Sequence, residues 1–151
     1  MLHIELITPE RTLLELEADV VTLPTPQGEI AVLPNHMPLV TTLVPGAAEV
    51  LYKTAGTVKS TLLAITGGYA EVQAGSRVLI LADAAERMED IDQARVEEAR
   101  ERASKLLTEE GFKDDVKFAD ATAALERSLA RLRVVRRHRS RRGSGTPETD
   151  S

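Results

Sequence analysis

The pattern of apolar residues changes once along this chain of 151 residues, close to Ala84, and this change constrains the architecture most strongly. Before Ala84, apolar and polar residues alternate over short runs such as residues 2–6, LHIEL, which is the period of a half-buried β-strand. After Ala84, long stretches of alanine, glutamate, arginine and leucine favour helix. The order predicts a β-structured unit followed by a helical unit.

Turn signals divide the β-structured unit into about ten short strands. Ala55-Gly56 separates apolar runs at residues 50–52 and 58–62, and Ala74-Gly75-Ser76 separates another two runs, as in β-hairpins. Short strands with closely spaced turns are typical of a β-sandwich or a β-barrel. The chain is 42% hydrophobic but only 3% aromatic, so we expect an aliphatic core.

Two helices are expected in the second unit. Asp90 is the expected N-cap of the first helix, with Gln93 in the capping-box position, and Gly111 is its expected end. The second helix is expected to start near Asp114 or Asp115, and the short break between the helices predicts an antiparallel α-helical hairpin. The apolar stripes are Val96, Ala99, Ala103 and Leu106 on the first helix, and Ala121, Leu125, Leu129 and Leu132 on the second.

The packing face of this hairpin is poor in large side chains. Alanines bury little apolar area, and burial stabilises by roughly 25 cal/mol per Å². We therefore expect the hairpin to dock weakly, and a weakly docked element can populate two arrangements.

Charge is unevenly distributed along the chain. The net charge is −5, yet residues 126–142 hold eight arginines and one glutamate. A concentrated cationic segment in an acidic chain indicates an acidic partner for that segment. A nucleic-acid-binding module is the alternative interpretation, although the scarcity of aromatic residues argues against stacking on bases.

Catalytic and targeting motifs are missing from the sequence. It has no cysteine, no phosphate-binding G-x-x-x-x-G-K-S/T loop and no G-x-S-x-G nucleophile motif, so no enzyme activity is expected. The three histidines are isolated from further ligands, so no metal site is expected. No signal peptide or membrane-spanning run is recognisable, and we expect any membrane association to depend on a partner.

Three segments carry a family resemblance, at residues 23–39 (LPTPQGEIAVLPNHMPL), 67–75 (GGYAEVQAG) and 78–92 (VLILADAAERMEDID). In this order, ahead of an alanine-rich helical hairpin, they resemble the epsilon subunit of bacterial F-type ATP synthase, called delta in mitochondria. The resemblance covers about residues 1–138. It implies an all-β sandwich at residues 1–85 and a C-terminal antiparallel α-helical hairpin at 86–139, while the composition of residues 140–151 predicts a disordered tail.

The resemblance also implies a function. The chain would be a non-catalytic central-stalk subunit that couples the gamma subunit to the c-ring during proton-driven ATP synthesis. Its C-terminal helices would extend and inhibit ATP hydrolysis by reaching the beta subunit. It would lie peripherally at the cytoplasmic face of the plasma membrane, held there by the complex.

The resemblance further implies which residues contact the other subunits, by their position in the sequence. The implied contacts with the c-ring and gamma are Glu29, Leu33 and His36, in a segment that Pro34 and Pro38 should stiffen. The implied contacts with the beta subunit are Arg133, Arg136 and Arg137.

A nucleotide site is the last implication. Residues 91–96, IDQARV, resemble the family's I/L-D-x-x-R-A motif, with Val96 in place of alanine. No cofactor is required, and ATP would be a weakly bound regulatory ligand. The alternative is that Asp92 and Arg95 form only a surface pair, worth roughly 0.2–0.5 kcal/mol. The candidate nucleotide-binding residues are Glu86, Ile91, Asp92, Arg95, Arg102, Arg127 and Arg131.

Overall fold

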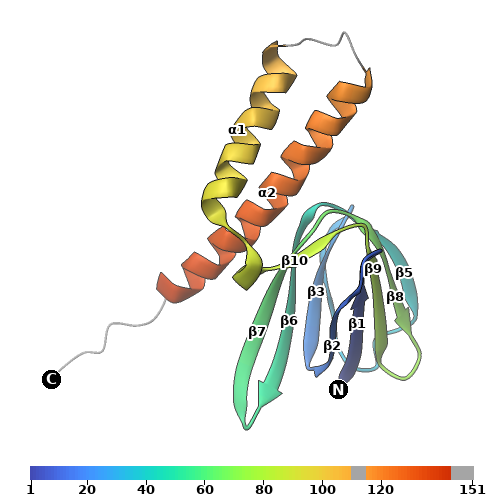
Figure 1. The fold of residues 1–151 in the computed structure, drawn as a ribbon. Helices are drawn as coiled ribbons and strands as arrows, with labels where there is room; N and C mark the ends of the chain where they lie inside the picture. The colour runs from blue at the N-terminus through green and yellow to red at the C-terminus, as the bar shows by residue number, and fades with distance from the viewer. Residues whose placement is uncertain (110–114, 144–151) are drawn as a thin grey trace, which may run out of the picture.

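Ten strands form two five-stranded sheets that face each other, and two long helices follow them (Figure 1). The structure is a computed structural model that describes residues 1–109 and 115–143. The strands are β1 (Leu2–Ile7), β2 (Thr12–Ala18), β3 (Val20–Thr25), β4 (Gly28–Val32), β5 (Leu39–Leu43), β6 (Gly46–Thr54), β7 (Thr57–Ile65), β8 (Gly68–Gln73), β9 (Arg77–Ala82) and β10 (Ala85–Arg87). A 3₁₀ turn at Met88–Asp90 leads to α1 (Gln93–Glu109) and α2 (Asp115–Gly143). The expected β-sandwich and helical hairpin are both confirmed.

The two sheets have the strand orders β2-β1-β9-β8-β5, called sheet A, and β10-β7-β6-β3-β4, called sheet B. Neighbouring strands pair antiparallel except β1 and β9, which run parallel. The core between the sheets is aliphatic, as expected, because alternate residues of each strand point inward. Its largest fully buried members include Leu2, Ile4, Leu6, Leu23, Leu63, Ile65 and Ile80.

Local backbone chemistry explains two of the connections. Ala55 and Gly56 both have positive φ, at 49° and 77°, as a two-residue type I′ hairpin requires, so the predicted β6–β7 turn is confirmed. Gly68 begins β8 beside β9, where an added Cβ would lie 2.0 Å from the Leu81 carbonyl oxygen. Only glycine allows this close approach of two backbones.

Asp92, and not Asp90, caps the first helix. Asp90 lies in the 3₁₀ turn, whereas the Asp92 Oδ1 accepts a hydrogen bond of 3.3 Å from the Arg95 backbone N–H. The capping prediction at Asp90 was therefore wrong, because the extra turn after β10 moves the start of α1 toward the C-terminus.

The helical stripes are partly confirmed. Val96, Ala103 and Ala121 are buried, but Leu106 and Leu129 are 50% and 37% exposed. Leu132 of the predicted stripe is also buried, and the buried face of α2 further includes Ser128, Ala130, Val134 and Val135. This face is wider than a single stripe because α2 contacts both α1 and sheet B.

Two expected boundaries differ from the structure. Strand β10 reaches Arg87, because its backbone pairs with β7, so Glu86 and Arg87 belong to the sandwich. Helix α2 continues to Gly143, so residues 140–143 are helical and not a disordered tail. Arginine favours helix and positive charge suits a helix C-terminus, which accounts for the extension. Gly111 and residues 144–151 lie outside the described residues.

Candidate functional site

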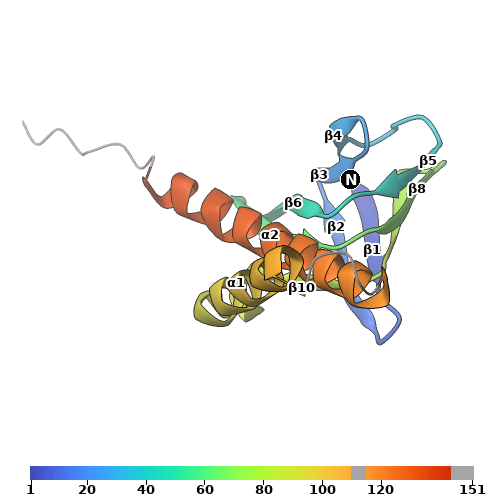
Figure 2. The same ribbon diagram turned by 90° about the horizontal axis from the view of Figure 1, so that it is seen from above.

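Helix α2 lies on the outer face of sheet B, where it contacts β6 and β7, and α1 packs chiefly against α2 (Figures 1 and 2). The surface of sheet B covered by α2 is called the docking face here. Its contacts decide how firmly the hairpin is held on the sandwich.

A small apolar seam lies at the centre of the docking face. It consists of buried Ala47, Leu62, Ala64 and Val134, with Met88 and Ile91 packed against it. On β6 and β7 these positions alternate with core residues such as Ala48 and Leu63, which point into the sandwich. Two of the three sheet residues in the seam are alanines, so the apolar area it buries is small.

Two ion pairs flank the seam. Arg131 Nε lies 2.6 Å from Glu86 Oε2, and Arg137 Nη2 donates to Glu29 Oε1 at 2.5 Å. The Glu86 oxygen accepts no well-aligned hydrogen bond from the described residues, so its contact with Arg131 is an ion pair only. The side chains of both pairs are partly exposed, and such pairs contribute roughly 0.2–1 kcal/mol each.

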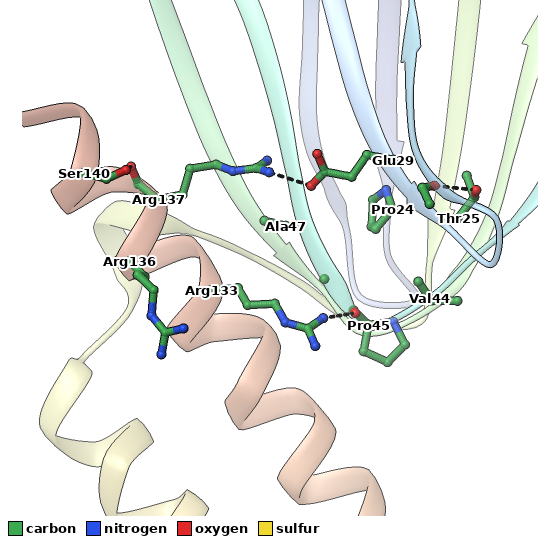
Figure 3. A pocket seen from close by; sticks show the side chains of 12 residues that line it. Pro24, Thr25, Glu29, Val44, Pro45, Ala47, Arg133, Arg136, Arg137 and Ser140 are labelled. Atoms are coloured by element: carbon green, nitrogen blue, oxygen red, sulfur yellow. Dashed lines mark hydrogen bonds and ion pairs between the residues drawn. The ribbon is translucent and has the colours of Figure 1, made fainter. Parts of the chain in front are cut away.

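A groove of about 540 Å³ lies beside the Arg137–Glu29 pair, between α2 and the ends of β3, β4 and β6 with the β5–β6 loop (Figure 3). Arg133 crosses it and donates to the Pro45 carbonyl oxygen at 3.0 Å. Arg136 also lines the groove and is exposed, with no ion pair to the described residues. The three arginines implied to contact the beta subunit therefore all line this groove.

A third contact lies at the far end of α2 and was missed from the sequence. Arg141 binds Glu49 on β6 through the two terminal nitrogens of its guanidinium, and its Nη1 donates to Ser60 Oγ on β7 at 3.2 Å. Glu49 is a lone charge in an otherwise apolar run, residues 47–51, AAEVL. This isolated charge was the sequence signal that could have predicted a contact at Glu49, because a buried carboxylate requires a partner.

Of the implied c-ring and gamma contacts, Glu29 lies on β4, whereas Leu33 and His36 lie in the short segment that follows this strand. Leu33 and the nearby Met37 are exposed. A turn closes with a 3.1 Å hydrogen bond from the His36 backbone N–H to the Leu33 carbonyl oxygen, around Pro34 and a positive-φ Asn35. The His36 ring nitrogen Nδ1 lies 2.8 Å from the Met37 carbonyl oxygen. The hydrogen-bonded turn orders this segment locally, and Leu33 and Met37 present apolar side chains outward.

The implied nucleotide residues are only partly brought together. Glu86 and Arg131 form the ion pair described above, and Ile91 packs at the neighbouring seam. Asp92 and Arg95 are paired with each other, with Arg95 Nε 3.5 Å from Asp92 Oδ2. Arg102 donates to the Glu98 carbonyl oxygen of its own helix, and Arg127 is exposed. Val96, where the motif has alanine, is buried.

Among residues 1–109 and 115–143, no three His, Cys, Asp or Glu side chains gather in a group that could hold a metal ion. Within the same residues, neither helix combines the length and apolar character needed to span a bilayer.

Two family models match consecutive parts of the chain and together cover residues 1–136. Residues 1–88 match the β-sandwich domain of the ATP synthase delta/epsilon chain, and residues 89–136 match the long α-helix domain of the same chain. The boundary between them falls one residue after β10, as the structure has it.

Curated relatives are similar to this chain over most of its length. The chain is 41% identical over 133 residues to the ATP synthase epsilon chain of Nitratidesulfovibrio vulgaris (strain DP4), covering 88% of this chain and 94% of that one. It is 42% identical over 134 residues to that of Syntrophobacter fumaroxidans, covering 89% and 95%.

A similar fold is found in a solved complex. One chain in the cryo-EM structure of the Euglena gracilis mitochondrial ATP synthase, OSCP/F1/c-ring, is 27% identical, with a TM-score of 0.74 and coverage of 91% of this chain and 81% of that one. From the family models and the identity to curated relatives, we conclude that the chain belongs to the ATP synthase epsilon chains, the non-catalytic subunits of the central stalk.

Proposed function

We propose that the sandwich of this chain joins the gamma subunit to the c-ring, and that the hairpin inhibits ATP hydrolysis when it leaves the docking face. Exposed Leu33 and Met37, beside a hydrogen-bonded turn, support a protein contact at the end of the sandwich that the family resemblance assigns to the rotor. Exposed apolar side chains gathered in one place are typical of interaction sites.

The inhibitory role is supported by one observation above all: α2 is held on sheet B by a small apolar seam and a few arginine contacts. An interface of this size can open while the sandwich stays folded, so a partner with higher affinity for the undocked state can shift the population. Arg133, Arg136 and Arg137 would then face acidic groups of the beta subunit in place of Glu29 and the Pro45 carbonyl.

Truncation tests both parts of the proposal. A chain that ends at Asp90 keeps β10 and the 3₁₀ turn and loses both helices. We expect the assembled complex to hydrolyse ATP faster, while the truncated chain still co-purifies with gamma. An unchanged rate would contradict hairpin inhibition, and loss of gamma from the purified complex would contradict the sandwich as the binding unit.

We propose ATP as a weak regulatory ligand at the seven residues named above. To bind there, it would have to compete with the Arg131–Glu86 and Arg95–Asp92 pairs, which supports a low affinity. Calorimetry with millimolar Mg·ATP should show heat that falls with Arg131→Ala and is retained with the Arg100→Ala control on the same hairpin. No heat with the unmodified chain would eliminate the site.

The proposal places the chain at the cytoplasmic face of the plasma membrane, held there by the complex. The alternative of a nucleic-acid-binding module gains no support from the structure. Three arginines of the basic segment already bind carboxylates of the chain's own sandwich.

A further inference from the structure

The end of α2 carries a contact that lies beyond the matched family domain. The match to the long α-helix domain stops at residue 136, whereas α2 continues to Gly143. Arg141, in this additional part of the helix, contacts Glu49 and Ser60 on sheet B. These three residues are called the Arg141 cluster.

Glu49 is unusual for its position on the sheet. It lies in the middle of sheet B, between β3 and β7, where it pairs with Thr22 on one side and Leu62 on the other. Its side chain shares the outer face with Ala47 of the apolar seam, and the residue is 6% exposed. A carboxylate so deeply covered must have a strong partner, because losing water costs far more for a charge than for a neutral group.

Arg141 meets that requirement. Its Nη2 donates to Glu49 Oε2 at 2.9 Å, its Nη1 contacts Oε1, and its Nη1 also donates to Ser60 Oγ at 3.2 Å. A guanidinium that holds both carboxylate oxygens is the strongest geometry available to this pair of side chains. The Arg131–Glu86 and Arg137–Glu29 contacts each involve a single carboxylate oxygen.

We propose that Glu49 and Ser60 form an intramolecular docking site for the end of α2, and that Arg141 bound there holds the hairpin on the sandwich. The docked state depends on Arg141 because α2 covers Glu49. If α2 stayed in place without Arg141, the carboxylate would be covered and unpaired. If α2 leaves, the carboxylate becomes hydrated. Loss of Arg141 therefore raises the free energy of the docked state by more than the attraction between Arg141 and Glu49, because the covered carboxylate would also lack a partner.

The consequence for regulation rests on the function proposed above. A hairpin held by the Arg141 cluster leaves the sandwich less readily than one held by the seam and the two flanking pairs, so this subunit is biased toward the position that permits hydrolysis. The docking site itself is a property of the isolated chain, so it can be tested without the complex.

The test follows docking by energy transfer between two dyes on the full chain. The sequence has no cysteine, so Lys53→Cys at the end of β6 and Ala119→Cys on α2, both exposed, give two defined attachment points. Arg141→Glu should raise the undocked population at least about tenfold, seen as a shift in transfer efficiency, with the helical circular dichroism retained.

Arg139→Glu is the matched control. It makes the same charge change in the same helical turn, but Arg139 donates to Gln93 of α1 and not to the sheet. Its transfer efficiency should stay near that of the unmodified chain. An effect as large as that of Arg141→Glu would show that charge at the helix end, and not the Glu49 site, controls docking.

The exchanged pair, Glu49→Arg with Arg141→Glu, gives the decisive outcome. We expect it to recover most of the docked population that Arg141→Glu alone loses. Unchanged transfer in the single Arg141→Glu variant would overturn the proposal. Failure of the exchange to recover docking, with the sandwich still folded by its thermal transition, would overturn it as well. Neither outcome depends on ATPase activity, so failure here is distinguishable from failure of the proposed function.

Discussion

Arg137 Nη2 lies 2.5 Å from Glu29 Oε1 across the gap between α2 and β4 (Figure 3). The family resemblance implies a contact with the beta subunit for Arg137 and a contact with the rotor for Glu29. In the docked arrangement these two residues bind each other. Docking of the hairpin therefore occupies side chains from both implied interfaces, so the position of the hairpin and the rotor contact should be energetically linked.

The Arg137–Glu29 pair should contribute modestly to docking. Glu29→Gln removes its charge and should weaken docking by roughly 0.2–1 kcal/mol, because both side chains remain partly exposed. The effect should shrink when the salt concentration is raised, since exposed pairs are screened. The dye pair described above measures it. Glu71→Gln on β8 of sheet A is the control, and an equal shift there would point to net charge as the cause.

Substitutions of two neighbouring leucines of β7 should affect docking of the hairpin and folding of the sandwich separately. Leu62 belongs to the seam and Leu63 to the core of the sandwich. Truncating a buried leucine to alanine costs about 2–5 kcal/mol. Leu63→Ala should lower the thermal midpoint of the sandwich, whereas Leu62→Ala should release the hairpin and leave that midpoint nearly unchanged. Calorimetry measures the thermal midpoint and dye transfer measures docking. Equal losses of sandwich stability in the two variants would contradict the placement of Leu62 and Leu63 on opposite faces of β7.

A disulfide across the seam should abolish inhibition. Ala47 and Val134 belong to the same buried cluster, and the chain has no other cysteine to interfere with the pair Ala47→Cys and Val134→Cys. Oxidised complex should hydrolyse ATP faster than the same complex after reduction, because the hairpin cannot leave the docking face. Bond formation is checked by gel mobility. With Ala47→Cys alone, oxidant should have no effect, and an oxidised double variant that remains inhibited would count against the proposal.

Gly68 should not tolerate a side chain. Gly68→Ala places a Cβ 2.0 Å from the Leu81 carbonyl oxygen at a φ of 124°. Strain of this kind costs on the order of 1–3 kcal/mol, and the backbone clash adds to it. Gly75→Ala also has a positive φ, of 80°, but open space around the added Cβ, so it is the comparison variant that lacks the clash. Denaturant unfolding should rank Gly68→Ala as the less stable variant, and the reverse order would contradict the close approach of β8 and β9.

Several features could be predicted from the sequence because they depend on neighbouring residues. Alternation in residues 2–6 indicated a strand, Ala55-Gly56 indicated a hairpin, and helix-forming residues after Ala84 indicated the two helices. The concentration of arginines in residues 126–142 indicated acidic partners, but it did not identify them. Each of these signals comes from local propensity or composition, which do not depend on how the chain closes on itself.

Contacts between distant residues were decided by the tertiary structure alone. The parallel pairing of β1 with β9, the exposure of Leu129 and the binding of Arg141 to Glu49, 92 positions away, all follow from how the sheets and helices pack. A residue's sequence neighbours do not specify which distant group it will meet, because such contacts form only when the whole core closes. The same arginines that the sequence marked as cationic are therefore assigned partners within the chain only by its fold.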